Sequence, residues 1–180
     1  MAELLSRLRR IPDRVLHPLR RQRVLDALRR RPRLTSLLVV CHGNICRSPF
    51  AAALLRRASA RNGVRVDSAG FLGPGRPPPP EAVAAAARHG VDLSAHRSQF
   101  VTADRVRLAN LIVVMDPTQG REIRDRFGRA GRDVLVLGDL DPEPIDTSTI
   151  QDPLHQPPRV FAETYARIER CVRELERAIG

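Results

Sequence analysis

The chain has 180 residues, of which 42% are hydrophobic and 28% charged; this fits one domain with one buried core and excludes a fibrous or largely disordered protein. Arginines outnumber acids, and the formal net charge is +11. The three unevenly spaced cysteines do not form a secreted disulfide framework, and no apolar run reaches the roughly 18 residues that span a membrane, so we expect a cytoplasmic protein with free thiols.

The positive charge is concentrated in the first 33 residues, which hold eleven arginines against three acids. The rest of the chain is nearly neutral, so we expect no nucleic-acid partner. Residues 1–34 are therefore set apart as a basic N-terminal extension, helical or disordered. Two interpretations stay open: a solvated extension, or an amphipathic segment whose leucines and arginines touch an anionic membrane surface.

The next segment, Leu37 to Val40, is short and wholly apolar, which is typical of a strand buried on both faces of a parallel sheet. The alanine- and leucine-rich stretch from Pro49 to Ala60 predicts a helix, because proline suits the first helical turn. The segment from Cys41 to Ser48 therefore lies between a strand and a helix.

Strand-like and helix-like segments keep alternating along the rest of the chain. We expect further strands at 64–66, 111–114 and 133–137, and further helices at 81–88, 103–109, 117–127 and 161–179. This order predicts that residues 35–180 form a three-layer α/β domain, a four-stranded, mostly parallel, twisted sheet with helices on both faces. Ligands in this architecture bind at the carboxyl ends of the strands, where Cys41 lies.

The segment after the first strand has the features of a phosphate-binding loop. A loop of this length can curl so that its backbone N–H groups converge on a phosphate, and the same groups favour a cysteine thiolate. Arg47 can hold two phosphoryl oxygens at once. The expected nucleophile is Cys41, and the residues expected to bind the phosphoryl group are His42, Gly43, Asn44, Ile45, Cys46 and Ser48.

These nine residues, Cys41-His42-Gly43-Asn44-Ile45-Cys46-Arg47-Ser48-Pro49, resemble the opening of the low-molecular-weight protein tyrosine phosphatases. The resemblance implies a phosphatase without metal or cofactor that works through a phosphocysteine intermediate. It implies a phosphorylated protein substrate, most simply a phosphotyrosine protein, and a tyrosine kinase as a partner. It also implies supporting roles for Ser68 and His89, whose side chains would hydrogen-bond Asn44.

The general acid has to be chosen among three Asp-Pro pairs, which begin at Asp116, Asp141 and Asp152. The resemblance implies an Asp-Pro on a loop before the last helix, and the spacing favours Asp152. Asp116 ends a strand, and Asp141 comes too early. Any Asp-Pro is otherwise typical of a turn, and Asp146 stays a further candidate for the acid.

The residue after this Asp-Pro is usually aromatic in the family, but here it is Leu154. Leucine gives apolar contact without an aromatic face, which weakens the expectation that phosphotyrosine stacks there. Cys46 lies close enough in a curled loop to form a regulatory disulfide with Cys41, or is simply a small buried residue.

The sequence leaves three alternative functions to compare with a tyrosine phosphatase. An arsenate reductase on this scaffold needs two further cysteines, and none occurs between Met115 and Asp133. A phosphoarginine phosphatase tends to carry threonine in place of Ile45. A module that binds oxyanions without catalysis is the third alternative.

Overall fold

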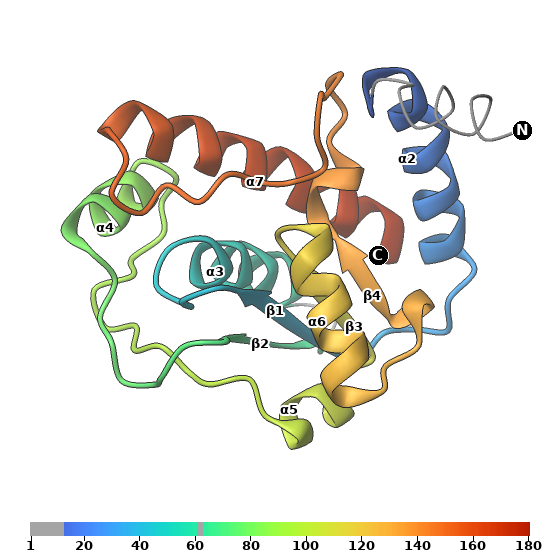
Figure 1. Ribbon diagram of the computed structural model, residues 1–180, viewed down its shortest axis with the longest axis horizontal. Coiled ribbons are helices and arrows are strands. Elements are labelled where there is room, and N and C mark those ends of the chain that lie inside the picture. The colour runs from blue at the N-terminus through green and yellow to red at the C-terminus, as the bar shows by residue number, and fades with distance from the viewer. Residues whose placement is uncertain (1–12, 61–62) are drawn as a thin grey trace, which may run out of the picture.

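The computed structural model describes residues 13–60 and 63–180, and residues 1–12 of the basic extension lie outside them. Figure 1 shows the chain from the blue N-terminal helix to the red C-terminal one. The elements in chain order are α2 (Asp13–Arg29), β1 (Ser36–Cys41), α3 (Arg47–Ser59), β2 (Arg65–Gly70), α4 (Pro80–Ala87), α5 (Ala103–Leu108), β3 (Leu111–Val114), α6 (Pro117–Phe127), η1 (Gly131–Asp133), β4 (Val134–Val136), η2 (Leu137–Leu140) and α7 (Pro158–Ile179).

The four strands form one parallel sheet in the order β2-β1-β3-β4. Strand β1 lies inside the sheet, and its Val40 pairs with Ala69 of β2 and Val114 of β3. All six residues of β1 are buried, as expected for a wholly apolar strand with helices on both faces. The α/β fold class expected from the sequence is confirmed.

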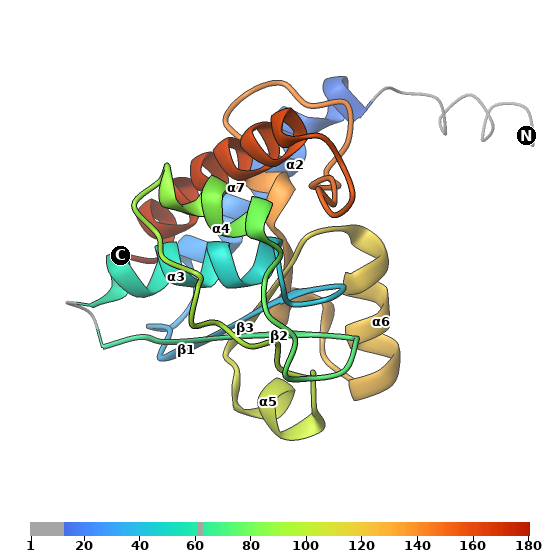
Figure 2. The ribbon, with the colours of Figure 1, turned by 90° about the vertical axis from the view of Figure 1, so that its left-hand side faces the viewer.

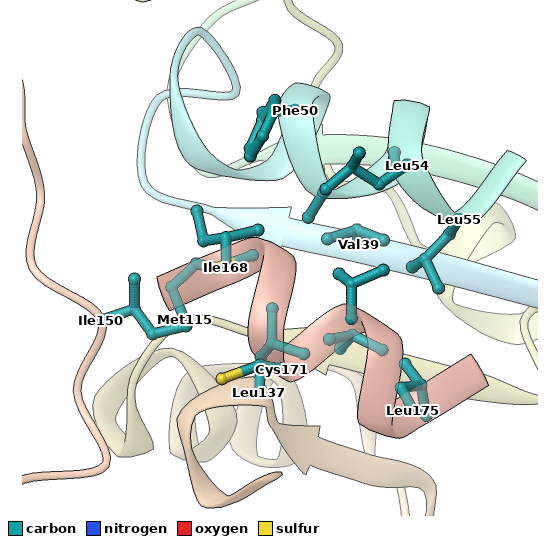
Figure 3. Close-up of a cluster of buried hydrophobic side chains, with 14 of the residues drawn as sticks. Val39, Phe50, Leu54, Leu55, Met115, Leu137, Ile150, Ile168, Cys171 and Leu175 are labelled. Carbon is teal, nitrogen blue, oxygen red and sulfur yellow. The ribbon is translucent and has the colours of Figure 1, made fainter. Parts of the chain in front are cut away.

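Helices cover both faces of the sheet, with α3, α4 and α7 on one side and α5 and α6 on the other (Figure 2). The alternation of side chains along β1 divides the core, since Val39 points to the α7 side and Val40 to the α6 side. The core thus has two hydrophobic clusters, and the one on the α7 side is the larger. Figure 3 shows this larger cluster, in which Cys171 of α7 lies near Leu137. Cys171 is fully buried there, so it is a core residue.

Two elements differ from the sequence expectation. Strand β2 continues to Gly70, because Ser68 pairs with Val39 and Gly70 with Cys41 of the central strand. The expected strand at 133–137 shortens to β4, with a 3-10 turn on each side. In both places pairing with a neighbouring strand, and not local composition, sets where the strand ends.

Helix α2 packs on the body of the domain. Its Leu25 and Leu28 are buried in the larger cluster, and Arg21 forms an ion pair with Glu174 of α7. The opposite side of its first half leaves Val15 and Leu19 more than 60% exposed. None of the helices within residues 13–60 and 63–180 has both the length and the apolar character needed to cross a bilayer.

Candidate active site

The loop from Cys41 to Arg47 joins the carboxyl end of β1 to the first turn of α3. Asn44 has a φ of 52°, the left-handed conformation that asparagine tolerates better than most residues, and this angle turns the chain back on itself. Apart from the exposed His42 and the half-buried Gly43, the residues of this loop are buried. The loop is thus held in a tight curl at the edge of the sheet where ligands bind in this architecture.

Hydrogen-bond donors surround the Cys41 thiol. Its Sγ lies 3.2 Å from the backbone N of Asn44 and 3.1 Å from Oγ of Ser48. The Asn44 side chain donates to the same Oγ at 2.8 Å, so the Ser48 hydroxyl hydrogen can point at the sulfur or at the carbonyl oxygen of Ala69, which lies 3.4 Å away. Donors placed in this way stabilise a thiolate, the form in which cysteine is a nucleophile.

Cys46 lies in a different environment. Burial is the main cause that raises the pKa of its thiol to about 12, so this cysteine stays protonated at neutral pH. Both Cys41 and Cys46 are free thiols in this structure. Of the two cysteines in the loop, only Cys41 has the contacts that a nucleophile needs, and a regulatory disulfide between them stays a prediction.

Asn44 is fixed by a segment that runs beside the loop, residues 96–99. Its side-chain oxygen accepts from the backbone N–H of Gln99 at 2.7 Å, and its backbone oxygen lies 2.8 Å from Nε2 of His96. Burial lowers the pKa of the His96 imidazole, which therefore stays neutral with its proton on Nε2 to serve this contact. These contacts hold the curl of the loop from outside.

The support expected from Ser68 and His89 is provided by other residues. His89 follows α4, which packs on α7, and its Nδ1 lies 3.0 Å from Glu169 of that helix. Ser68 is buried within β2. In the described part of the chain, the serine and the histidine that contact Asn44 are Ser48 and His96.

Gly70, the last residue of β2, lies directly against the loop. A Cβ added at this position would lie 2.7 Å from the backbone N of Asn44 and 2.8 Å from the carbonyl oxygen of His42. Because both are backbone atoms, they cannot move aside without opening the loop. The position therefore requires glycine for close approach, although its φ is not in the left-handed region.

The three Asp-Pro pairs have different positions in the fold. Asp116 caps α6, where its side chain accepts from the backbone N of Gln119 at 2.8 Å. Asp141 is fully buried beside two arginines of α7. Asp152 alone of the three contacts Arg47, and its side chain remains 40% exposed.

Arg47 is directed toward the segment that carries Asp152. One guanidinium nitrogen donates to the backbone oxygen of Ile150 at 3.0 Å, and another contacts the Asp152 carboxylate. The second carboxylate oxygen of Asp152 accepts from the backbone N–H of Leu154 at 3.2 Å. Arg47 and the accessible Asp152 carboxyl group thus contact each other at the end of the loop that Cys41 begins, and a thiol, a guanidinium and a carboxyl group are a set that suits transfer of a phosphoryl group.

Leu154 and His155, which follow the Asp152-Pro153 pair, are called the rim of the site. Leu154 is half-buried and packs against the larger cluster, and His155 is exposed. Asp146, the further candidate for the acid, is exposed on the preceding loop. Within residues 13–60 and 63–180, no group of three or more His, Cys, Asp or Glu side chains is placed to hold a metal ion.

Comparison with known proteins agrees with the family resemblance of the loop sequence. Residues 36–180 match the family model described as low molecular weight phosphotyrosine protein phosphatase. The chain is 43% identical over 140 residues to the probable low molecular weight protein-tyrosine-phosphatase EpsP of Ralstonia solanacearum, an alignment that covers 77% of this chain and 92% of EpsP. It is 32% identical to Wzb of Escherichia coli K12, with 81% of this chain and 95% of Wzb covered.

Solved structures with the same fold include phosphatases of two kinds. The tyrosine phosphatase amsI of Erwinia amylovora superposes with a TM-score of 0.72 at 29% identity, covering 81% of this chain and 93% of amsI. The YwlE arginine phosphatase of Geobacillus stearothermophilus superposes with a TM-score of 0.71 at 28% identity, covering 79% and 91% of the two chains.

Proposed function

Because the chain belongs to the low molecular weight phosphotyrosine protein phosphatase family and is a cysteine-dependent phosphoric monoester hydrolase, we propose that it hydrolyses phosphotyrosine in a protein substrate. The proposed nucleophile is Cys41, the proposed general acid is Asp152, and Arg47 would bind the phosphoryl oxygens. The observation that carries this assignment is the contact of Arg47 with Asp152, two residues 105 positions apart in the sequence.

The proposed reaction has two steps. The Cys41 thiolate attacks phosphorus, the bond from phosphorus to the tyrosine oxygen breaks, and Asp152 gives its proton to that oxygen. Asp152 then takes a proton from water, which attacks the phosphocysteine and releases inorganic phosphate and the thiolate. Arg47 and the loop N–H groups stabilise the charge on the equatorial oxygens in both steps.

Two features bear on the leaving group. Ile45 stands where arginine phosphatases of this scaffold tend to carry threonine, and an apolar side chain there suits a phenol better than a guanidinium. Leu154 offers an apolar wall to a phenyl ring without a stacking partner. We therefore propose phosphotyrosine as the substrate, with phosphoarginine as the alternative to be tested beside it.

A phosphotyrosine substrate requires a tyrosine kinase that forms it, and the partners we propose are that phosphorylated protein and that kinase.

We also propose that α2 rests on the cytoplasmic face of an anionic membrane, since Val15, Leu16 and Leu19 are exposed beside the basic residues Arg14 and Arg23. Co-sedimentation with phosphatidylglycerol vesicles should fall in the double variant Val15→Ser, Leu19→Ser. Equal sedimentation of the variant and the wild type would contradict this contact.

The phosphatase proposal is tested by turnover of an aryl phosphate, a phosphotyrosine peptide and a phosphoarginine peptide, all in the presence of a metal chelator. We expect activity with the tyrosine substrates, none in Cys41→Ser, and retained activity in the control Cys171→Ala, which removes a thiol from the core instead. Activity that survives Cys41→Ser would exclude the covalent route. A clear preference for phosphoarginine would replace tyrosine as the substrate.

A further inference from the structure

One peptide group of the phosphate-binding loop, that between Gly43 and Asn44, has a hydrogen-bond partner on each side. Its N–H points at Sγ of Cys41, with 3.2 Å between nitrogen and sulfur. Its carbonyl oxygen accepts from Nη2 of Arg76 at 2.9 Å. Arg76 is thus joined to the nucleophilic sulfur through a single peptide plane.

Arg76 lies in the proline-rich connector between β2 and α4, and Ser98 holds its backbone in place. The backbone N–H of Arg76 donates to the Ser98 hydroxyl at 3.0 Å, and that hydroxyl donates to the carbonyl of Gly73 at 3.1 Å. In return the backbone N–H of Ser98 donates to the carbonyl of Arg76 at 2.9 Å. Because Ser98 is fully buried, the guanidinium is delivered to the loop from a fixed backbone.

The surroundings of Arg76 are arranged for this contact. A Cβ at Gly43 would lie 2.8 Å from Nη2 of Arg76, so the absence of a side chain there is what lets the guanidinium approach. The Nε of Arg76 is buried without a hydrogen-bond partner among the described residues. An unpaired buried donor costs free energy, which the contact with the loop has to offset.

Arg76 also differs from Arg47 in whether its guanidinium forms an ion pair with a carboxylate. Arg47 contacts the Asp152 carboxylate. Among the residues that the structure describes, no carboxylate forms an ion pair with Arg76. The guanidinium thus contacts the Gly43 carbonyl without a carboxylate that neutralises its charge.

We propose that Arg76 is a positioning residue, which acts on the Cys41 thiolate through the Gly43–Asn44 peptide. A cation on the carbonyl oxygen polarises the peptide group and makes its N–H a stronger donor to the sulfur. The same contact fixes the direction of that N–H, which points at Sγ of Cys41. This inference deepens the proposed function of the same site and rests on it.

The principal test is the pH dependence of Cys41 alkylation by iodoacetamide, followed by mass spectrometry of the peptide that contains Cys41. We expect the pH midpoint to move upward by about one unit in Arg76→Gln, because one charge-assisted contact behind the thiolate is lost. Arg76→Lys, which keeps the charge, should restore most of the shift. The matched control Arg121→Gln removes an exposed arginine of α6 and should leave the midpoint unchanged.

The route through the peptide is tested by the backbone amide resonance of Asn44. In ¹H–¹⁵N spectra of Arg76→Gln, we expect this resonance to move while the overall pattern of the folded protein is kept. A midpoint that moves without any change at the Asn44 amide would show a direct effect of the charge and would overturn the route through the peptide.

Alkylation needs no turnover, so this inference and the proposed function fail in different ways. A wild type inactive on every phosphate ester counts against the proposed function, whereas an unchanged midpoint in Arg76→Gln overturns the role of Arg76. If Arg76→Gln does not fold, Ser98→Ala takes its place, because it frees the backbone of Arg76 and keeps the guanidinium. We expect a smaller shift in the same direction, and an unchanged midpoint in this variant would equally overturn the proposal.

Discussion

Asp141 and Asp152 have the same immediate setting in the sequence, an aspartate followed by proline, and each contacts arginine, yet the two are very different groups in the folded protein. The Asp141 side chain is 0% exposed and bonds with Arg167 at 2.9 Å and Arg170 at 3.2 Å, both from α7. The Asp152 side chain is 40% exposed and contacts the single arginine of the phosphate-binding loop.

The difference supports the proposal that the contact of Asp152 with Arg47 is reactive, whereas the contacts of Asp141 are structural. Asp141 is enclosed by two cations, and neither water nor substrate reaches its oxygens. Asp152 is accessible. In the proposed reaction a bound phosphoryl group competes with it for Arg47 and so frees its carboxyl group for proton transfer. Access to solvent and the number of partners, rather than the Asp-Pro dipeptide, separate the two roles.

The comparison predicts the largest loss of activity at Asp152. In Asp152→Asn, kcat for a substrate with a poor leaving group should fall by about 10²- to 10⁴-fold, since proton donation to that oxygen is lost. The loss should be smaller for a good leaving group, which departs without a proton. Stopped assays with a series of aryl phosphates check this, and full activity across the series would move the role of acid to Asp146.

Asp141 should show the opposite pattern, with stability lost and chemistry kept. In Asp141→Asn, Arg167 and Arg170 lose a fully buried carboxylate, although Arg170 keeps its ion pair with Glu143, and we expect the free energy of unfolding to fall by about 3 kcal/mol. Urea denaturation followed by circular dichroism measures this change, and kcat per folded molecule should equal that of the wild type. The control Asp104→Asn breaks an exposed pair with Arg107 and should cost less than about 1 kcal/mol. A folded but inactive Asp141→Asn would contradict the division of roles.

The smallest expected effect is that of a substitution at Leu154, two residues after Asp152. An aromatic ring in Leu154→Tyr should add stacking of about 0.5–1.5 kcal/mol to a bound phenyl group, which lowers KM for a phosphotyrosine peptide up to about tenfold. Inhibition by inorganic phosphate should not change, since phosphate has no ring to stack. A gain for phosphate as well as for the peptide would mean that the substitution had altered the loop instead of the rim.

Much of the fold was predictable because its strands are short, apolar and separated by clear helices. Strand β2 was only half recognised, since Asp67 and Ser68 are polar and only their pairing with β1 makes them part of a strand. Helix α2 was set apart with the charged extension, although Leu25 and Leu28 on its inner side lie in the core. In both cases the missing information was the identity of the neighbouring element in space.

The residues of the site also separate into those that the sequence predicted and those that it did not. Cys41, Asn44 and Arg47 could be proposed from the sequence because six consecutive peptide bonds connect them, and Asp152 because its distance from the last helix resembles a known pattern. The contacts of His96 and Arg76 with the loop could not be predicted, since nothing local distinguishes these residues from His89 or from the other arginines. These contacts come from the path of residues 70–99, which returns twice to the loop.

The close approach of Gly70 to the loop also bears on how this enzyme could change during evolution. A side chain at this position would collide with the loop backbone. Substitutions of Gly70 are therefore not tolerated unless the conformation of the loop changes as well. Leu154 is half-buried beside the exposed His155, and no such barrier exists there. New substrate preferences can therefore accumulate by single substitutions at the rim while the chemistry beneath them is inherited unchanged.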